Sequence, residues 1–316
     1  MQAPIGSAST PELVAAVSNA GGLGMLALTW TTPERARQRI RRVRELTERP
    51  FGVNLVLDFP VDDKLAVCRQ ERVPVVSTSW GDPAGFARPI QDAGALHLHS
   101  VGSAAQARRA VDAGVDIIVA QGWEAGGHVS GLVATLPLVP AVVDAVAPVP
   151  VIAAGGIADG RGLAAVLALG AQAGWLGTRF LTAAETMTHA VYRERVLAAT
   201  GEDAVHTMCF DGGWPGAAHR AIRNSTLAAW EAAGRPAAPD RPGEGDVLAT
   251  DATGRVEHLR YGDMMPLPGM AGDVEAMALY AGQSAGLVND LAPAADIVAR
   301  IVHEATEVVS ALARLG

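Results

Sequence analysis

Short β-prone runs alternate with helical segments along the first 200 residues, and this alternation constrains the fold more than any other feature. The runs are apolar and brief, as expected for parallel strands that are covered on both faces. Between them, helical patterns place small or branched apolar residues on one face at 33–47, 103–113 and 161–169. Strands are expected at 2–5, 25–28, 52–57, 75–78, 95–100, 116–121, 151–154 and 172–176. Eight units of similar size predict a TIM-type (β/α)8 barrel, with a doubly wound open sheet as the alternative.

The alternation stops after residue 200. We expect the barrel domain at 1–200, an insert packed beside its mouth at 201–265, and C-terminal helices that return to the barrel at 266–316. Helices are expected at 220–230, 273–281 and 294–315. The segment 235–246 is rich in proline, glycine and charge and is expected to be a loop. Pro293 is typical of a helix start.

Composition excludes several classes of function. The net charge of −8 argues against a nucleic-acid-binding protein. No apolar run is long enough to span a membrane, and the start lacks the features of a signal peptide. The two cysteines, Cys68 and Cys209, fit no metal or redox spacing. We therefore expect a reduced cytoplasmic protein that acts on a small molecule.

Two glycine-bearing loops follow the last two expected strands. Gly155 and Gly156 follow the strand at 151–154, and Gly177 and Thr178 follow the strand at 172–176. In a TIM barrel the loops after strands seven and eight commonly bind a phosphate, because glycine lets backbone N–H groups approach the anion. Tight strand-to-helix packing also requires glycine and is the alternative for either loop alone. The occurrence of a glycine loop in each of these two adjacent units favours a phosphate-bearing ligand.

The longest gap between strands begins at Gln121 and contains His128. This loop leaves the carboxyl end of strand six, the face on which barrel enzymes carry out catalysis. An imidazole titrates near neutral pH, so His128 is the candidate general acid or base. Gly126 and Gly127 would let the backbone pass close to a flat ligand. The alternative for His128 is an ordinary surface histidine.

A metal site is not expected. His97 and His99 alternate along strand five and therefore point the same way. No carboxylate or cysteine lies at ligand spacing from this pair, so structural roles are favoured over zinc binding.

Tryptophans are placed unevenly along the chain. Trp30, Trp80 and Trp123 each follow an expected strand, and Trp175 lies within the last one. Their placement predicts either a cap on the barrel core or a flat, apolar substrate pocket at the mouth.

Taken together, these motifs resemble the nitronate monooxygenase (2-nitropropane dioxygenase) family, which includes the FMN-dependent enoyl-ACP reductases. Each motif is weak alone, but the ordered set covers most of the chain. The motifs are Gln2–Pro4, Val17–Gly22, Phe51–Asn54, Gln121-Gly122 with Glu124–His128, Ala154–Ile157, Gly177–Phe180 and Arg223-Asn224.

The resemblance implies a TIM-type barrel that binds FMN at its C-terminal mouth. His128 matches the family's active-site histidine. The residues implied to bind FMN are Asn54, Gln121, Gly126, Gly155, Gly156, Leu176, Gly177 and Thr178. The absence of a Gly-x-Gly-x-x-Gly turn after a strand also favours FMN over a dinucleotide.

The resemblance further implies oxidation of small nitronates or nitroalkanes with dioxygen. The alternative is an FMN- and NAD(P)H-dependent reductase of enoyl thioesters or quinones. A non-redox barrel that acts on a sugar phosphate as an isomerase or lyase would need a catalytic lysine or paired carboxylates at strand ends. The only lysine, Lys64, lies in a helical stretch. A non-catalytic flavin-binding protein is a further alternative. The oligomeric state is left open, a homodimer included.

The substrate pocket is where the sequence departs from the family pattern. Ile5 and Gly6 stand where a methionine usually follows Gln-Ala-Pro, and Ser100 stands where a lysine or glutamine is common. These departures leave FMN binding expected and the substrate open. The residues expected to line the substrate pocket are Ile5, Trp30, Trp80 and Trp123.

Overall fold

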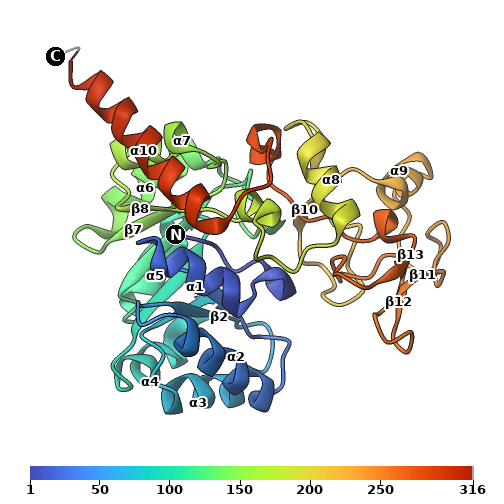
Figure 1. Ribbon diagram of the computed structural model, residues 1–316, viewed down its shortest axis with the longest axis horizontal. Helices are drawn as coiled ribbons and strands as arrows, with labels where there is room; N and C mark the ends of the chain where they lie inside the picture. Colours follow the sequence, from blue (N-terminus) through green and yellow to red (C-terminus); the bar gives the residue numbers. More distant parts are fainter. Residues whose placement is uncertain (315–316) are drawn as a thin grey trace.

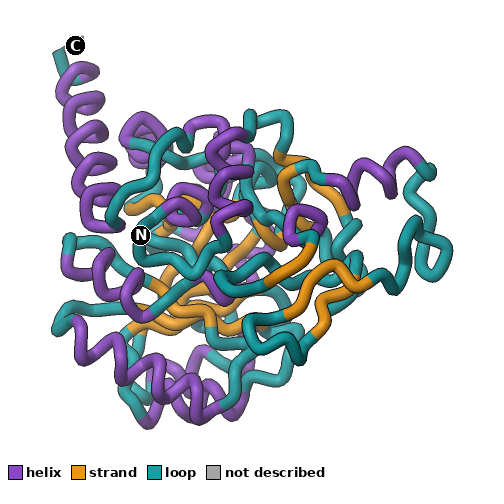
Figure 2. Tube along the Cα trace, turned by 45° about the vertical axis from the view of Figure 1, so that its right-hand side comes forward, coloured by secondary structure: helices purple, strands orange, loops and turns teal. Residues whose placement is uncertain are grey.

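A sheet of parallel strands forms the centre of the molecule, in the order β1-β2-β3-β4-β5-β7-β8. The computed structural model describes residues 1–314. The strands gather in the middle of the fold, with helices outside them (Figure 2). Their bounds are β1 (Met25–Ala27), β2 (Gly52–Val56), β3 (Val75–Ser79), β4 (Leu96–Val101), β5 (Ile117–Gln121), β7 (Val151–Ala154) and β8 (Ala173–Trp175).

The first residues of the chain close this sheet into a barrel. Gln2 forms a parallel bridge with Leu176, beyond the end of β8. On its other side, the Gln2 N–H donates to the carbonyl of Leu23 (3.0 Å), and Gln2 Oε1 accepts from the N–H of Met25 (2.8 Å). The (β/α)8 prediction is therefore confirmed and the open-sheet alternative is wrong. The strand expected at 2–5 is reduced to a single bridge.

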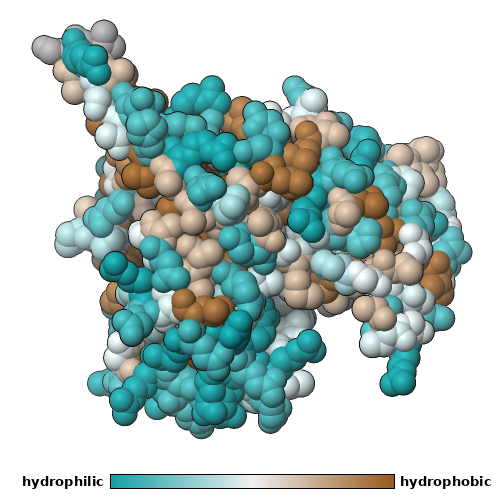
Figure 3. Space-filling view, viewed as in Figure 1, coloured by the Kyte–Doolittle hydropathy of each residue, from teal (hydrophilic) through white to brown (hydrophobic). Residues whose placement is uncertain are grey.

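Helices cover the outside of the barrel (Figure 1). Thr32 caps α2 by accepting a hydrogen bond from the N–H of Arg35, and Pro33 occupies the first turn. The face over α2 and α3 is mostly hydrophilic (Figure 3), which is consistent with the many arginines of α2. The helices are α1 (Pro11–Asn19), α2 (Pro33–Leu46), α3 (Asp62–Gln70), α4 (Ala87–Gln91), α5 (Ala104–Asp112), α6 (Thr135–Val146), α7 (Gly160–Ala168) and α8 (Ala190–Ala198).

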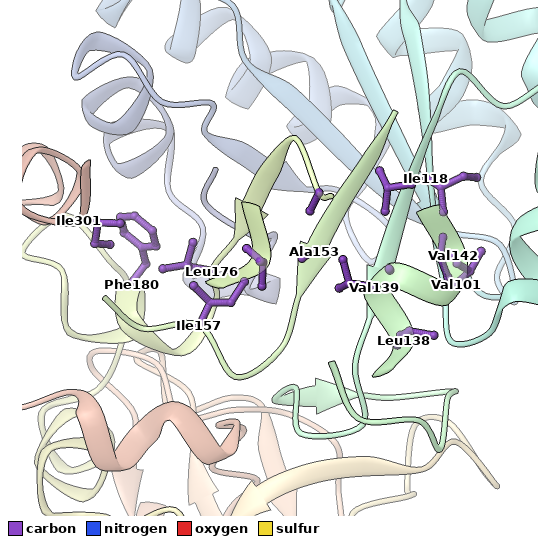
Figure 4. Packing of buried hydrophobic residues seen from close by; sticks show 14 of the residues in the cluster. Val101, Ile118, Leu138, Val139, Val142, Ala153, Ile157, Leu176, Phe180 and Ile301 are labelled. Atoms are coloured by element: carbon purple, nitrogen blue, oxygen red, sulfur yellow. The ribbon is translucent and has the colours of Figure 1, made fainter. Parts of the chain in front are cut away.

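Residues after α8 form an excursion to one side of the barrel and then return (Figure 1). Two small antiparallel sheets lie here, in the orders β6-β10-β9 and β12-β11-β13, and the barrel contributes β6 to the first of them through the loop after β5. The long helix α10 packs back on the barrel, where Ile301 joins the core that contains Ile157, Leu176 and Phe180 (Figure 4). The elements are β6 (Gly127–His128), β9 (Ala204–Thr207), β10 (His219–Ile222), α9 (Ser225–Ala232), β11 (Val247–Thr250), β12 (Glu257–Leu259), β13 (Ala271–Gly272) and α10 (Ala294–Leu312).

Of the three helices predicted after residue 200, the one at 220–230 is partly right and the one at 273–281 is wrong. The segment 220–230 begins as β10, and only Ser225–Ala232 is helical. The segment 273–281 contains only a 3-10 turn, Val274–Ala276. The residues beyond this turn run extended beside β10, where the Ile222 N–H donates to the Leu279 carbonyl (2.8 Å). The helix expected at 294–315 is confirmed as α10, although Leu315 lies outside the described residues.

Within residues 1–314, no helix combines the length and apolar character that a membrane span requires. The same residues contain no cluster of three or more His, Cys, Asp or Glu side chains that could hold a metal ion.

Candidate active site

A cavity of about 390 Å³ lies at the carboxyl ends of the barrel strands. Residues of the excursion complete its walls. Most of the residues predicted from the sequence line it, namely Ile5, Trp30, Asn54, Trp80, Gln121, Gly126, His128, Gly155, Gly156, Gly177 and Thr178. The structure therefore brings together residues that come from every part of the barrel.

Two predicted residues, Leu176 and Trp123, lie outside this lining. Leu176 belongs to the core between the barrel and its helices (Figure 4). Trp123 lies under the guanidinium of Arg220, 4.3 Å from its carbon to the ring centroid. The structure therefore separates both side chains from the cavity.

The glycine loops present free backbone donors to the cavity. Gly155 and Gly156 have φ values of +99° and +72°, which L side chains rarely adopt. Among the described residues, the N–H groups of Gly156 and Gly177 donate to no backbone carbonyl. A Cβ at Gly156 would lie 3.2 Å from Cγ of Glu124. The loops therefore suit close approach of an anion to the backbone.

The N-terminus of α7 is not available to that anion. Asp159 accepts hydrogen bonds from the N–H groups of Arg161 (3.0 Å) and Gly162 (3.1 Å). Glu304 of α10 accepts from the Gly160 N–H (3.0 Å). Carboxylates already neutralise the positive end of the helix dipole, so an anion would be held by the glycine loops themselves.

Three polar side chains complete this part of the cavity. Asn54 donates from Nδ2 to Ser77 Oγ (2.8 Å), and Gln121 donates from Nε2 to the His128 carbonyl (3.2 Å). The indole Nε1 of Trp175 is buried and has no hydrogen-bond partner among the described residues. An unpaired buried donor is unfavourable and indicates a polar ligand atom at this point.

His128 lies on β6 and is surrounded by aromatic rings. Its centroid is 4.4 Å from Trp214, 5.4 Å from Tyr280 and 6.4 Å from Trp80. Burial, with a smaller contribution from His219, lowers the pKa of His128 to about 3. Its Nε2 is buried without a partner among the described residues. The imidazole is therefore neutral at physiological pH and has hydrogen-bonding capacity to spare.

His219 pairs with His128 across the β6–β10 ladder. Its Nδ1 lies 3.0 Å from the Ala217 carbonyl, and its Nε2 accepts from the Phe210 N–H (3.2 Å). Because Nε2 accepts this bond, it is unprotonated and the ring is neutral. Burial lowers the pKa of His219 and favours the same state.

Trp80 has a left-handed backbone, with φ +59°. This conformation is strained for a bulky residue and is found mainly where function requires it. The Trp80 ring lies 4.7 Å from Trp214, which in turn lies 6.3 Å from Trp30 at the mouth. Trp30 is 56% exposed. The Trp214 plane is tilted by 57° to Trp80 and by 59° to Trp30, so the three indoles form an apolar but uneven wall from His128 to the surface.

Asp263 is the one carboxylate among the described residues that line the cavity, and none of them is an arginine or a lysine. Burial raises the pKa of Asp263. Tyr280 OH donates to the Asp263 carbonyl (3.0 Å), and Tyr192 OH donates to the Tyr280 carbonyl. A side chain at Gly213 would collide with both carboxylate oxygens of Asp263. The Asp263 carboxylate therefore lies against the backbone that precedes Trp214.

Sequence analysis missed Trp214, His219, Tyr280 and Asp263. All four come from the excursion, where no local pattern indicates which residues turn back to the barrel.

Known proteins resemble this chain over nearly its whole length. The family model described as nitronate monooxygenase matches residues 1–61 and 59–304. A nitronate monooxygenase of Pseudomonas aeruginosa is 34% identical, over 96% of this chain and 95% of its own length. The (3aS,4S,5R,7aS)-5-hydroxy-7a-methyl-1-oxo-octahydro-1H-indene-4-carboxyl-CoA dehydrogenase of Mycobacterium tuberculosis is 32% identical, over 96% of this chain and 92% of its own length.

Among solved structures, FabK from Thermotoga maritima superposes with a TM-score of 0.86 and 36% identity, over 100% of this chain and 94% of its own. The sequence resemblance is thus confirmed at the level of the family, while these relatives carry different activities in their names. The chain belongs to the nitronate monooxygenase family of oxidoreductases.

Proposed function

We propose that the cavity binds one FMN and that the protein is an FMN-dependent nitronate monooxygenase that oxidises small nitro compounds, as nitronates or nitroalkanes, with dioxygen. The observation that carries this proposal is the position of His128, a neutral buried imidazole, in the same cavity as the two glycine loops. Bound FMN would accept electrons from the substrate and pass them to dioxygen.

The residues present fit FMN. The free N–H groups of Gly156 and Gly177 would hold its phosphate. Asn54 and Gln121 each use their amide nitrogen within the protein, which leaves the amide oxygens for a ligand. The Trp175 indole N–H would find in the flavin the acceptor that it lacks. The Thr178 hydroxyl accepts from the Gly282 N–H (2.9 Å), which fixes the loop and leaves its own O–H as a donor for the ligand.

His128 acts on the substrate. A neutral imidazole can accept the α proton of a nitroalkane or donate a hydrogen bond to a nitro oxygen. Trp214 and Tyr280 pack around the ring, exclude water and fix its orientation. The pKa of about 3 makes the imidazole a weak base, so a hydrogen bond from His128 to a nitro oxygen is favoured over abstraction of the α proton.

The direct test is the visible spectrum of the purified protein, with release of the cofactor by denaturation. FMN is expected in the supernatant; FAD, or no flavin after reconstitution with FMN, would contradict the proposal. Anaerobic addition of a nitroalkane or its nitronate should bleach the flavin, and admission of air should restore it. Bleaching by NADH or NADPH alone would instead support the reductase.

That second candidate, an FMN- and NAD(P)H-dependent reductase, has its own support in the lack of arginine and lysine among the described residues that line the cavity. Among the described residues no arginine or lysine lines it, which suits a neutral enoyl group or a quinone better than a charged carrier. The 36% identity to FabK is consistent with this chemistry.

A further inference from the structure

We propose that Thr135, held in place by Glu124, is a positioning residue that aims the Gly156 N–H at the phosphate of the bound cofactor. The inference rests on the proposed function in taking the glycine loop at 155–156 as a phosphate site. It goes further in naming the two side chains that give this loop its orientation. Neither of them belongs to the residues that line the cavity.

The first observation is that α6 begins without a capping side chain of its own. Ala134 occupies the N-cap position, where a serine, threonine or aspartate would ordinarily accept a hydrogen bond from the first turn. Instead, both carboxylate oxygens of Glu124 accept from the Thr135 N–H, at 3.1 and 3.0 Å. The helix dipole also favours a carboxylate at this end of a helix. Glu124 therefore fixes Thr135, the first residue of α6, from the loop after β5.

The second observation is the bond that Thr135 makes in turn. Its hydroxyl donates to the Gly155 carbonyl (3.1 Å) and, at longer range, to the Ala154 carbonyl (3.4 Å). The Gly155 carbonyl and the Gly156 N–H belong to one planar trans peptide unit, so they point in opposite directions. Fixing the carbonyl therefore directs the Gly156 N–H away from Thr135. Among the described residues this N–H has no backbone acceptor, so it remains available to a ligand.

The loop needs such a support because it consists of glycine. Gly155 and Gly156 have φ values of +99° and +72°, and glycine loses more conformational freedom on ordering than any other residue. An N–H that is already oriented binds an anion without that entropic cost at the moment of binding. Glu124 adds a steric limit, since its Cγ lies 3.2 Å and its Oε1 3.3 Å from the position of a Cβ at Gly156.

The backbone around Glu124 is held independently of these side-chain bonds. The Glu124 carbonyl accepts from the Gln283 N–H (3.0 Å), and the Trp123 N–H donates to the Val133 carbonyl (2.8 Å). Removal of the Thr135 hydroxyl should therefore loosen one peptide unit without unfolding the barrel.

The experiment compares two flavins that differ only in the phosphate, FMN and riboflavin. Each is titrated into the flavin-free protein, and binding is followed by flavin fluorescence. Thr135→Val keeps the shape of the side chain but removes its hydroxyl. We expect FMN affinity to fall by about tenfold, the usual effect of losing a hydrogen bond to a charged group, and riboflavin affinity to change by less than about threefold. Thr135→Ser keeps the hydroxyl and should restore FMN binding.

Matched controls separate this effect from a general loss of stability. Thr226→Val removes a similar bond, from a buried hydroxyl near the start of α9 to the Ala276 carbonyl (2.8 Å). For Glu124→Ala the control is Glu185→Ala, since Glu185 accepts from the N–H of Ala294, the first residue of α10 (2.9 Å). Glu124→Ala should lower the ratio of FMN affinity to riboflavin affinity, and neither control should change it.

An unchanged ratio in Thr135→Val, or an equal loss of both flavins, would overturn the proposal. Tighter FMN binding in Glu124→Ala would do the same, because the carboxylate would then repel the phosphate instead of supporting the loop. If Thr135→Val fails to fold, the ratio in Glu124→Ala decides.

A second readout does not depend on flavin. The NMR order parameter of the Gly156 amide in the flavin-free protein should fall in Thr135→Val and recover in Thr135→Ser. If the protein binds no flavin or oxidises no nitro compound, the proposed function fails, while this order parameter still tests the support of the loop. If the wild type binds FMN and oxidises nitro compounds but Thr135→Val behaves like the wild type, only the inference about Thr135 fails.

Discussion

The imidazole of His128 lies against the indole of Trp214, with ring centroids 4.4 Å apart and an angle of 33° between the planes. His128 belongs to the barrel side of the chain and Trp214 to the excursion. The indole shields the imidazole from water, and this burial is the main reason for the low pKa of His128.

Replacing Trp214 by leucine should therefore raise the pKa of His128 from about 3 toward the ordinary value for histidine. Removing part of the shield lets water reach the ring and stabilises the imidazolium. The pKa is measured by NMR titration of the imidazole protons. Trp230→Leu is the control, since that indole donates to the Pro236 carbonyl (2.9 Å) and lies outside the rings around His128. An unchanged pKa in Trp214→Leu would assign the shift to other neighbours.

His128→Ala should retain the flavin and lower kcat/KM for nitroalkanes by about 10²- to 10⁴-fold, the usual contribution of a positioned acid or base. Gly126 and Gly127 keep the loop in place without the imidazole. The flavin-to-protein absorbance ratio checks cofactor content, and steady-state oxygen consumption checks turnover. A loss of only a few-fold would mean that His128 does not take part in the reaction.

Gly156→Val should give a folded protein that is largely free of flavin. A branched side chain at φ +72° shifts the loop, and its Cβ would press on Glu124 at 3.2 Å. The matched control is Gly94→Val, because Gly94 has φ +79° and nothing within 4 Å of an added Cβ. Both variants bear similar backbone strain, so flavin loss in Gly156→Val alone separates cofactor binding from stability. Equal flavin content in the two would place the phosphate elsewhere.

Trp80→Gly should be more stable to unfolding than Trp80→Ala by about 1 kcal/mol, although both remove the indole. Glycine adopts φ +59° without strain, whereas alanine does not. Urea denaturation of the two variants gives the difference directly. If alanine proves equal or better, the backbone at residue 80 relaxes when the ring is lost.

Acidification should destabilise the protein between pH 6.5 and about 4. His97 and His99 are buried beside Thr78, whose hydroxyl lies 2.7 and 2.8 Å from their ring nitrogens, and burial lowers their pKa values to about 3 and about 4. In this range the unfolded chain binds more protons than the folded one, so the free energy of unfolding falls as pH falls. Each histidine contributes about 1.4 kcal/mol per pH unit.

The measurement is the urea midpoint from pH 7 to 5. His97→Gln should flatten its pH dependence, while His303→Gln, on an exposed part of α10, should not. Parallel curves for wild type and His97→Gln would show that other groups dominate acid unfolding.

The barrel could be predicted because its information is local. Each strand is a short apolar run, and β2, β3 and β7 lie within a residue of their expected bounds. The glycine loops follow from the strand ends in the same way. The alternation of side chains along a strand could also have predicted the position of Leu176. Trp175 faces the barrel interior, so the neighbouring Leu176 must face the helices.

The remainder of the site depends on pairings between distant segments. Nothing in the sequence near residue 128 indicates that β6 will pair with β10, and nothing near residue 279 indicates an extended chain instead of a helix. Trp123 follows a strand as Trp80 does, yet stacking by Arg220 draws it away from the cavity. Such contacts override local propensity.

The pairing of His128 with His219 has a consequence for engineering. The barrel delivers the glycine loops, whereas the excursion delivers most of the surroundings of the His128 imidazole. A chimera that exchanges only the excursion between relatives would change the substrate range and the acidity of His128 together. A graft should therefore carry β6 together with β9 and β10, so that the whole three-stranded sheet is inherited from one parent.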